Sequence, residues 1–176
     1  IGDAWNLTAD TRLQADFSTG PVKHQMFAGV DQIWSEWNHT RTGRNLPGTI
    51  NIFDPVYQGV TGPFALQVGQ DVDERQTGAY FQDQLEWDRW RLTAGLRYDW
   101  SRIDLRNTMN NTRTITDAED LTGRIGLLYL FDNGIAPYAS YATSFEPISG
   151  ADIAGNAFDP SNGEQFEIGV KYEPKN

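Results

Sequence analysis

The feature of this sequence that most constrains its fold is a strict alternation of apolar and polar positions. In the stretch 90–101, apolar side chains occupy every second position, and polar or charged residues or glycine stand between them. The apolar set is Trp90, Leu92, Ala94, Leu96, Tyr98 and Trp100. Successive side chains of a β-strand point to opposite faces, so such a strand separates two environments. An apolar face with aromatic ends and a charged opposite face predicts the wall of a transmembrane β-barrel, with lipid outside and a wet lumen inside.

The composition agrees with a barrel wall and excludes several function classes. Mean hydropathy is −0.55 and 22% of residues are charged, as expected when only every second residue of a strand meets lipid. A net charge of −10 without a basic stripe argues against a nucleic-acid partner. The chain has no cysteine, which excludes disulfides, thiolate metal sites and cysteine nucleophiles.

Alternating stretches and turn residues predict an all-β fold of antiparallel strands in up-and-down order. The expected strands are residues 5–17, 22–41, 74–85, 90–105, 121–131, 135–145 and 164–172. Short turns are expected near Gly20, Asp88 and Asn133, where Asn133-Gly134 is typical of a tight hairpin. Longer loops are expected at 42–73, 106–119 and 146–163. In bacterial barrels the short turns face the periplasm, so strands one, three, five and seven should run toward it.

An odd number of strands has a consequence for domain organisation. Single-chain bacterial barrels have an even number of strands, and closure removes exposed strand edges. We therefore expect residues 1–176 to form one arc of a larger barrel, a partial barrel domain that does not close alone.

Several phrases carry a resemblance to one family. These are STGPVKHQMFAGVD at 18–31, TGAYFQDQLEWDRWRLTAGLRYDW at 77–100, LFDNGIAPYASYATSFEP at 130–147 and GEQFEIGVKYEP at 163–174. They resemble the barrel of TonB-dependent outer-membrane siderophore receptors, in the branch that takes up ferric hydroxamates such as ferrichrome and ferrioxamine. In the long loops only INIFDPVY at 50–57 is similar.

The resemblance implies a barrel of about 22 strands, filled by an N-terminal plug domain that carries the segment engaging the TonB complex. No plug-like sequence or TonB-binding segment is recognisable in these 176 residues. The resemblance thus implies a segment of an outer-membrane receptor that imports ferric hydroxamates with energy from the inner membrane. The alternative is a passive porin or other solute channel, which has the same alternating wall but no plug. A soluble ligand-binding barrel fits less well, because apolar residues dominate the outward face.

Aromatic residues are the candidates for ligand contact. A ferric hydroxamate has little net charge and an organic surface, so its site needs aromatic walls and a few hydrogen-bond donors. The iron arrives already coordinated, so no protein metal site or cofactor is expected. The candidates are Trp37, Phe53, Tyr57, Phe145 and Phe158. Each of them has a simpler explanation, which is anchoring at the membrane interface or packing between loops.

Polar residues on the lumen side of the strands are the candidates for contact with the plug. By alternation this set is Tyr80, Gln82, Gln84, Arg97, Asp99, Arg124 and Tyr138, followed by Ser140, Glu167 and Lys171. In an open pore these side chains would line water. In a plugged barrel, which the resemblance implies, they would hydrogen-bond the plug and hold it reversibly.

An enzyme is not expected. The two histidines, His24 and His39, lie at opposite ends of one expected strand, and no Gly-x-Ser-x-Gly motif is present. The acidic segment 71–74 lacks the spaced acids and the glycine of a calcium-binding EF-hand loop.

Overall fold

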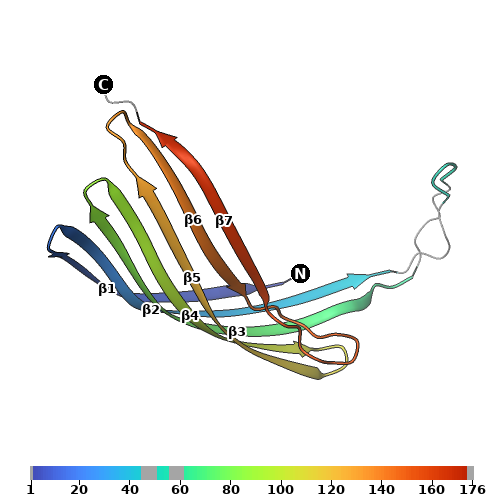
Figure 1. Cartoon of the computed structure of the whole chain (residues 1–176). Coiled ribbons are helices and arrows are strands. Elements are labelled where there is room, and N and C mark those ends of the chain that lie inside the picture. Colours follow the sequence, from blue (N-terminus) through green and yellow to red (C-terminus); the bar gives the residue numbers. More distant parts are fainter. Residues whose placement is uncertain (1, 45–50, 56–61, 174–176) are drawn as a thin grey trace.

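The computed structural model describes residues 2–44, 51–55 and 62–173, and these form one curved antiparallel sheet (Figure 1). The strands follow one another in chain order from β1 to β7, so the predicted up-and-down topology is confirmed. Their bounds are β1 Ala4–Thr19, β2 Val22–Gly43, β3 Ala65–Trp87, β4 Trp90–Asn107, β5 Thr112–Tyr129, β6 Ile135–Glu146 and β7 Ser161–Tyr172. Among the described residues, no helix is long and apolar enough to cross a membrane.

Tight turns close the hairpins at one end of the sheet, as predicted. Gly20, Asp88 and Gly134 have φ angles of 60°, 49° and 83°, in the left-handed region that short hairpin turns require. The Asn133 side chain fixes the third turn by accepting a hydrogen bond from the amide of Ile135 at 3.1 Å. The turns at Gly20, Asp88 and Gly134 therefore lie at the end that the sequence assigns to the periplasm.

Two of the expected loops at the other end are shorter than predicted. β3 begins at Ala65 instead of residue 74, and β5 begins at Thr112 instead of residue 121. The first loop thus covers 44–64, and the expected loop 106–119 is a four-residue turn at 108–111. The third loop, 147–160, lies close to its expected position.

The physical reason for these longer strands is that charged residues on the outward face continue the pairing beyond the apolar belt. On the inward face of the same part of the sheet, Val72, Ile103 and Thr116 are buried. Arg102 of β4 lies opposite Asp117 of β5 with a 3.1 Å ion pair, and Asp104 forms an ion pair with Arg113. The hydrogen bonds from Arg113 lower the pKa of Asp104. Cross-strand pairs of opposite charge stabilise a sheet without any hydrophobic alternation.

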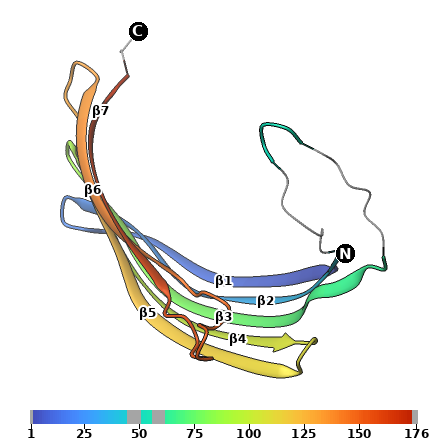
Figure 2. The ribbon, with the colours of Figure 1, turned by 90° about the vertical axis from the view of Figure 1, so that its right-hand side faces the viewer.

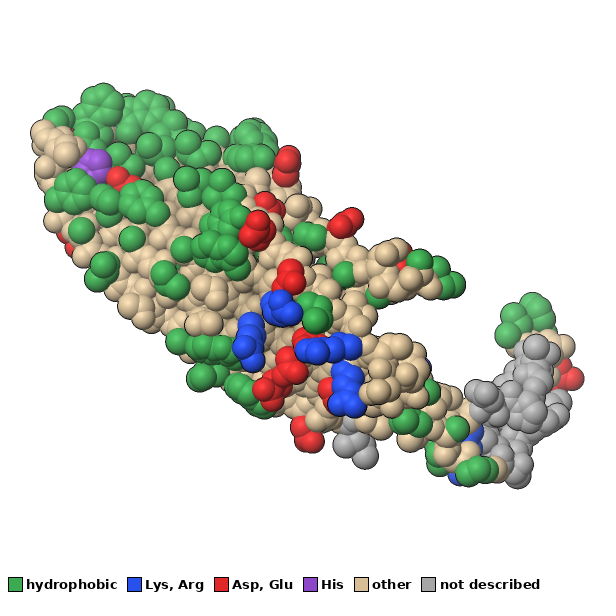
Figure 3. All heavy atoms as spheres, turned by 90° about the horizontal axis from the view of Figure 1, so that it is seen from below, with side chains coloured by type: hydrophobic (Ala, Val, Ile, Leu, Met, Phe, Trp, Pro, Cys, Tyr) green, Lys and Arg blue, Asp and Glu red, His purple; other side chains and the backbone are tan. Residues whose placement is uncertain are grey.

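The strand register carries one apolar face across the sheet. Phe81 of β3 pairs with Leu96 of β4, and Leu92 lies opposite Leu85 on one side and Leu127 on the other. This face lies on the convex side of the sheet, where hydrophobic side chains gather toward one end and charged ones toward the other (Figures 2 and 3). Leu96 is 59% exposed in the sheet. Exposed apolar side chains in such a belt are what a lipid-facing wall requires.

Aromatic residues mark both ends of this apolar belt. At the tight-turn end, the rings of Trp90 and Tyr129 meet edge-on at 4.7 Å, and at the other end Tyr98 packs against Trp100 at 4.7 Å. The segment from Trp90 to Trp100 is about 33 Å long at 3.3 Å per residue. At the usual tilt of barrel strands it spans about 25 Å, which is the height of an outer-membrane apolar band.

The ladder between β5 and β6 is short compared with the others. β2 and β3 pair from Lys23 to Gly43, whereas β5 pairs with β6 only at 124–128 opposite 138–142. Beyond this ladder, β5 extends farther toward the outer end of the sheet than β6 and β7 do (Figure 1).

We predict that charge on the two faces has unequal effects. Leu96→Arg places a cation against lipid near the middle of the belt and should cost about 2 to 4 kcal/mol. Thr93→Arg, on the opposite face of the same strand, should cost much less. Heat-modified gel mobility of the barrel protein in membranes measures the folded fraction, and equal losses for the two variants would contradict the face assignment.

Candidate functional site

The centre of the concave face is a polar network built around Arg97 of β4. Its guanidinium forks between two carboxylates, reaching Asp31 of β2 at 2.8 Å and Asp99 of β4 at 2.7 Å. Gln76 of β3 also donates to Asp99 at 3.0 Å. The Asp99 side chain is only 4% exposed. The network therefore joins three strands and sets one cation against two carboxylates, which leaves a net negative charge on this part of the wall.

Glycines in neighbouring strands make room for these side chains. A Cβ at Gly78 would lie 1.9 Å from Nη2 of Arg97, and one at Gly29 would lie 2.5 Å from the hydroxyl of Tyr80. Tyr80 crosses the wall over Gly29 and donates to Asp10 of β1 at 2.9 Å. The glycines thus allow long polar side chains to lie flat against the sheet and not project into the lumen.

A hollow of about 680 Å³ lies on this face beside the network. Its lining includes Tyr80, Gln82, Gln84, Arg97 and Arg124, five of the residues predicted to face the lumen. Phe27 adds an aromatic ring, with the Arg12 guanidinium 5.5 Å from its centroid. Amide, guanidinium and aromatic groups on one concave wall suit a polar protein surface that docks and releases.

A second polar group lies on β6 and β7. Tyr138 hydrogen-bonds Glu167, and the ammonium of Lys171 lies 5.2 Å from the Tyr138 ring centroid. Gly169 provides the space below this ring, since a Cβ there would meet it at 2.7 Å. The predicted shared face of Tyr138, Ser140 and Glu167 is confirmed by the register. That these residues contact a plug stays a prediction.

The predicted ligand-contacting aromatics do not form one cluster among the described residues. Trp37 of β2 has the lumen parity of Asp31, is half-buried, and pairs with Val72. Phe53 lies in the short segment 51–55 and is 91% exposed. Tyr57 lies outside the described residues. Ligand contact by these residues stays a prediction.

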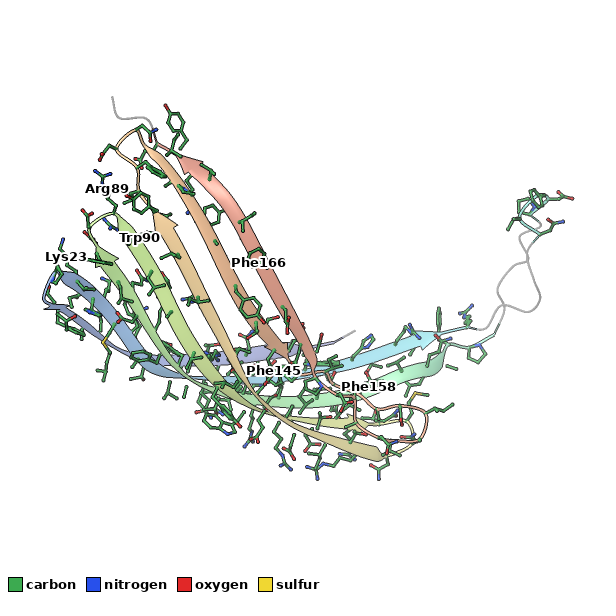
Figure 4. The ribbon with its side chains drawn as sticks, viewed as in Figure 1. Lys23, Arg89, Trp90, Phe145, Phe158 and Phe166 are labelled. Carbon is green, nitrogen blue, oxygen red and sulfur yellow. The ribbon has the colours of Figure 1, made fainter. Side chains whose placement is uncertain are left out.

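Phe145 and Phe158 lie near the outer end of β6 and β7 (Figure 4). In the register Tyr141 lies opposite Ile125, which is on the apolar face. Phe145 is four residues farther along β6, so alternation places it on the same outward side as Tyr141. Phe158 packs on Gly150, whose added Cβ would be 3.0 Å from its ring. The roles of both residues in ligand binding also stay predictions.

The loop 147–160 that contains Phe158 is preformed. Asp152 accepts hydrogen bonds from the backbone and side chain of Asn156 at 2.8 and 3.0 Å and from the amide of Ala154 at 2.8 Å. The Asn156 contacts lower the pKa of Asp152. The loop therefore presents its side chains on a fixed turn at neutral pH.

Sequence reasoning missed several members of the network. Asp10, Arg12, Asp31 and Gln76 were not predicted to take part. Alternation gives the face of a residue, but the partners depend on cross-strand register, which alternation alone does not provide. Within the described residues, no group of three or more His, Asp or Glu side chains is arranged to hold a metal ion.

We predict that Gly78→Ala disrupts the network, because the new methyl group overlaps the Arg97 guanidinium. Losing charge-assisted hydrogen bonds there should destabilise the barrel by about 2 kcal/mol. Gly126→Ala is the matched control, since its Cβ makes only ordinary contacts, with the Ser140 Cβ at 3.6 Å and the Ala139 carbonyl oxygen at 3.9 Å. Unfolding midpoints of the two variants compare the effects, and an unchanged midpoint for Gly78→Ala would contradict the packing described.

Comparisons with known proteins agree with this architecture. The family described as TonB dependent receptor-like, beta-barrel, matches residues 2–176. The ferrioxamine B receptor of Salmonella typhimurium is 40% identical over 168 residues, which are 96% of this chain and 24% of that protein. The ferrichrome outer membrane transporter/phage receptor of Escherichia coli is 38% identical over 181 residues, covering 97% of this chain and 24% of that protein.

The chain thus spans about a quarter of the length of these relatives. Among solved structures, the ferric citrate transporter FecA in the unliganded form superposes with a TM-score of 0.78 at 18% identity. That match covers 97% of this chain and 25% of FecA. At this identity the match concerns the fold.

Proposed function

This chain belongs to the TonB-dependent receptors as part of their outer-membrane β-barrel, and we propose that the protein containing it imports a ferric hydroxamate siderophore. The observation that carries the proposal is the 38–40% identity, along at least 96% of the chain, to receptors named for ferrioxamine B and ferrichrome. Both names denote iron complexes of hydroxamates. The family consists of receptors and transporters.

Capture would occur at the outer end of the sheet. The ligand offers apolar carbon surface and few charges, so Trp37 at the rim and Phe53 and Tyr57 in the first loop would contribute apolar contact area. Phe158 would add to it from the other side of the mouth, whereas Phe145, which has outward parity, would contribute only from the rim. The ligand brings its iron fully coordinated, so the protein needs neither a metal ligand nor a cofactor. It also needs no catalytic step, because the iron complex undergoes no chemical change during import.

Passage would be gated by a plug domain held on the concave wall. The wall offers the hollow beside Arg97 and the Tyr138–Glu167 pair, both of which combine charge with hydrogen-bonding groups. Polar contacts of mixed charge allow a plug to dock and release, whereas an apolar wall would hold it permanently. The energy would come from the TonB complex, acting through a region outside this chain. The strands that complete the barrel would pair with β1 and β7, each of which has a neighbour on one side only in the described sheet.

We predict that replacing Trp37, Phe53 and Tyr57 together with Ala weakens binding of ferrioxamine B or ferrichrome to the intact receptor. Buried aromatic contacts dominate such interfaces, so the loss should exceed about 2 kcal/mol, or roughly thirtyfold in affinity. Phe145→Ala, measured separately, tests whether that residue contributes. Trp34→Ala is the matched control, because Trp34 lies on the lipid face of the same strand.

Ligand choice and energy dependence complete this test. The wild-type receptor should bind ferric hydroxamates and should not bind vitamin B12 or haem. If equilibrium binding detects no ferric hydroxamate, or if solutes cross without an energised inner membrane, a passive channel replaces the proposal.

A further inference from the structure

Two ionisable side chains interrupt the apolar belt on the convex face. From the row of paired residues that contains Val30 and Tyr98 to the tight turns, His24 and Asp83 are the only acidic or basic residues with outward parity on the described parts of β1 to β5. A charged side chain facing lipid is costly, and such residues usually mark a functional site.

These two residues and Thr19 form a hydrogen-bonded chain across three strands. Nδ1 of His24 lies 2.7 Å from Oδ2 of Asp83, and its Nε2 lies 2.7 Å from the hydroxyl of Thr19. Phe17 stacks on the imidazole with ring centroids 4.8 Å apart and 2° between their planes. The second carboxylate oxygen of Asp83, Oδ1, is buried and has no hydrogen-bond partner among the described residues. The site is therefore built and rigid but leaves one acceptor unused.

A groove of about 580 Å³ lies one row farther along the same face, away from the tight turns. The small residues Ala28 and Ala79, which belong to successive rows of the register, line it with the larger Leu13, Phe81, Leu96 and Leu121. Its lining is mostly apolar, as an acyl chain requires. Successive pairs of outward residues on β2 and β3 link the two parts: His24 with Leu85, then Met26 with Asp83, then Ala28 with Phe81. The polar chain and the groove therefore form one continuous surface.

We propose that this surface binds a phospholipid of the periplasmic leaflet that carries a primary ammonium headgroup. The headgroup lies at Thr19, His24 and Asp83 beside the tight-turn end, and one acyl chain occupies the groove. The site lies on the opposite face from the lumen, so the proposal is independent of siderophore import.

Charge complementarity selects the ammonium group. With a neutral imidazole whose Nδ1–H donates to Asp83, the Thr19 hydroxyl donates to Nε2, and the site carries the single charge of the carboxylate. A primary ammonium has three donors and matches this acceptor. Met26 and Ala94 flank Asp83 in the register, and a shift of the flexible Met26 side chain gives a donor access to Oδ1. An anionic headgroup finds no cation on this part of the face.

The test is native mass spectrometry of the intact receptor in detergent, titrated with three lipids that have the same acyl chains. The probes are phosphatidylethanolamine, phosphatidylcholine and phosphatidylglycerol. We expect the wild type to retain phosphatidylethanolamine about tenfold more tightly than the other two, which is the size of one charge-assisted hydrogen bond. Trimethylation in phosphatidylcholine removes the donors but keeps the charge, so this pair isolates hydrogen bonding to the carboxylate.

Variants separate the headgroup from the chain. Asp83→Asn should abolish the preference for phosphatidylethanolamine, and Ala79→Phe should weaken retention of all three lipids by filling the groove. Glu36→Gln is the control, because Glu36 is an outward carboxylate beyond the belt. Siderophore binding should stay unchanged in every variant.

Equal retention of the three lipids by the wild type would overturn the proposal, even if the Asp83→Asn barrel does not assemble. A full preference in a folded Asp83→Asn variant would overturn it as well. In either case the hydrogen-bonded chain would serve only to join the β1–β2 hairpin to β3.

Discussion

Every other feature of this structure depends on the inter-strand hydrogen-bond ladder. In a membrane the backbone has no water to bond, so each strand must satisfy its polar groups through its neighbours. Once the ladder forms, the two faces of the sheet are fixed, and a slip of one residue would move Arg97 and Asp99 into lipid. The polar network, the apolar belt and the position of the tight turns all follow from one register.

That dependence explains what the sequence alone could predict. The wall of the belt was predictable because lipid and water impose opposite demands on alternate residues. β4 matched its expected bounds within two residues, and the three tight turns lay where Gly20, Asp88 and Asn133 indicated. The first nine residues of β3 and of β5 were missed, because polar and charged residues replace most of the apolar ones on their outward face and no alternation marks them.

The candidate site was predictable in part for the same reason. Parity placed Tyr80, Arg97 and Tyr138 on the lumen face, and the register agrees. It could not show that Arg97 joins Asp31 to Asp99, or that Gly78 provides the space for it. Those contacts depend on residues far apart in the chain. The pairing of His24 with Asp83 escaped prediction because the two residues are 59 positions apart.

The short ladder between β5 and β6 makes the stiffness of the wall uneven. β1 to β5 are joined along most of their lengths, and β6 is joined to β7 from Ile135 to Glu146, but the backbone ladder between β5 and β6 covers only 124–128 opposite 138–142. Opening free energy depends on how many hydrogen bonds and contacts must break together. The wall therefore consists of two stiff panels on a narrow hinge, and amide hydrogen exchange should be fastest along that seam.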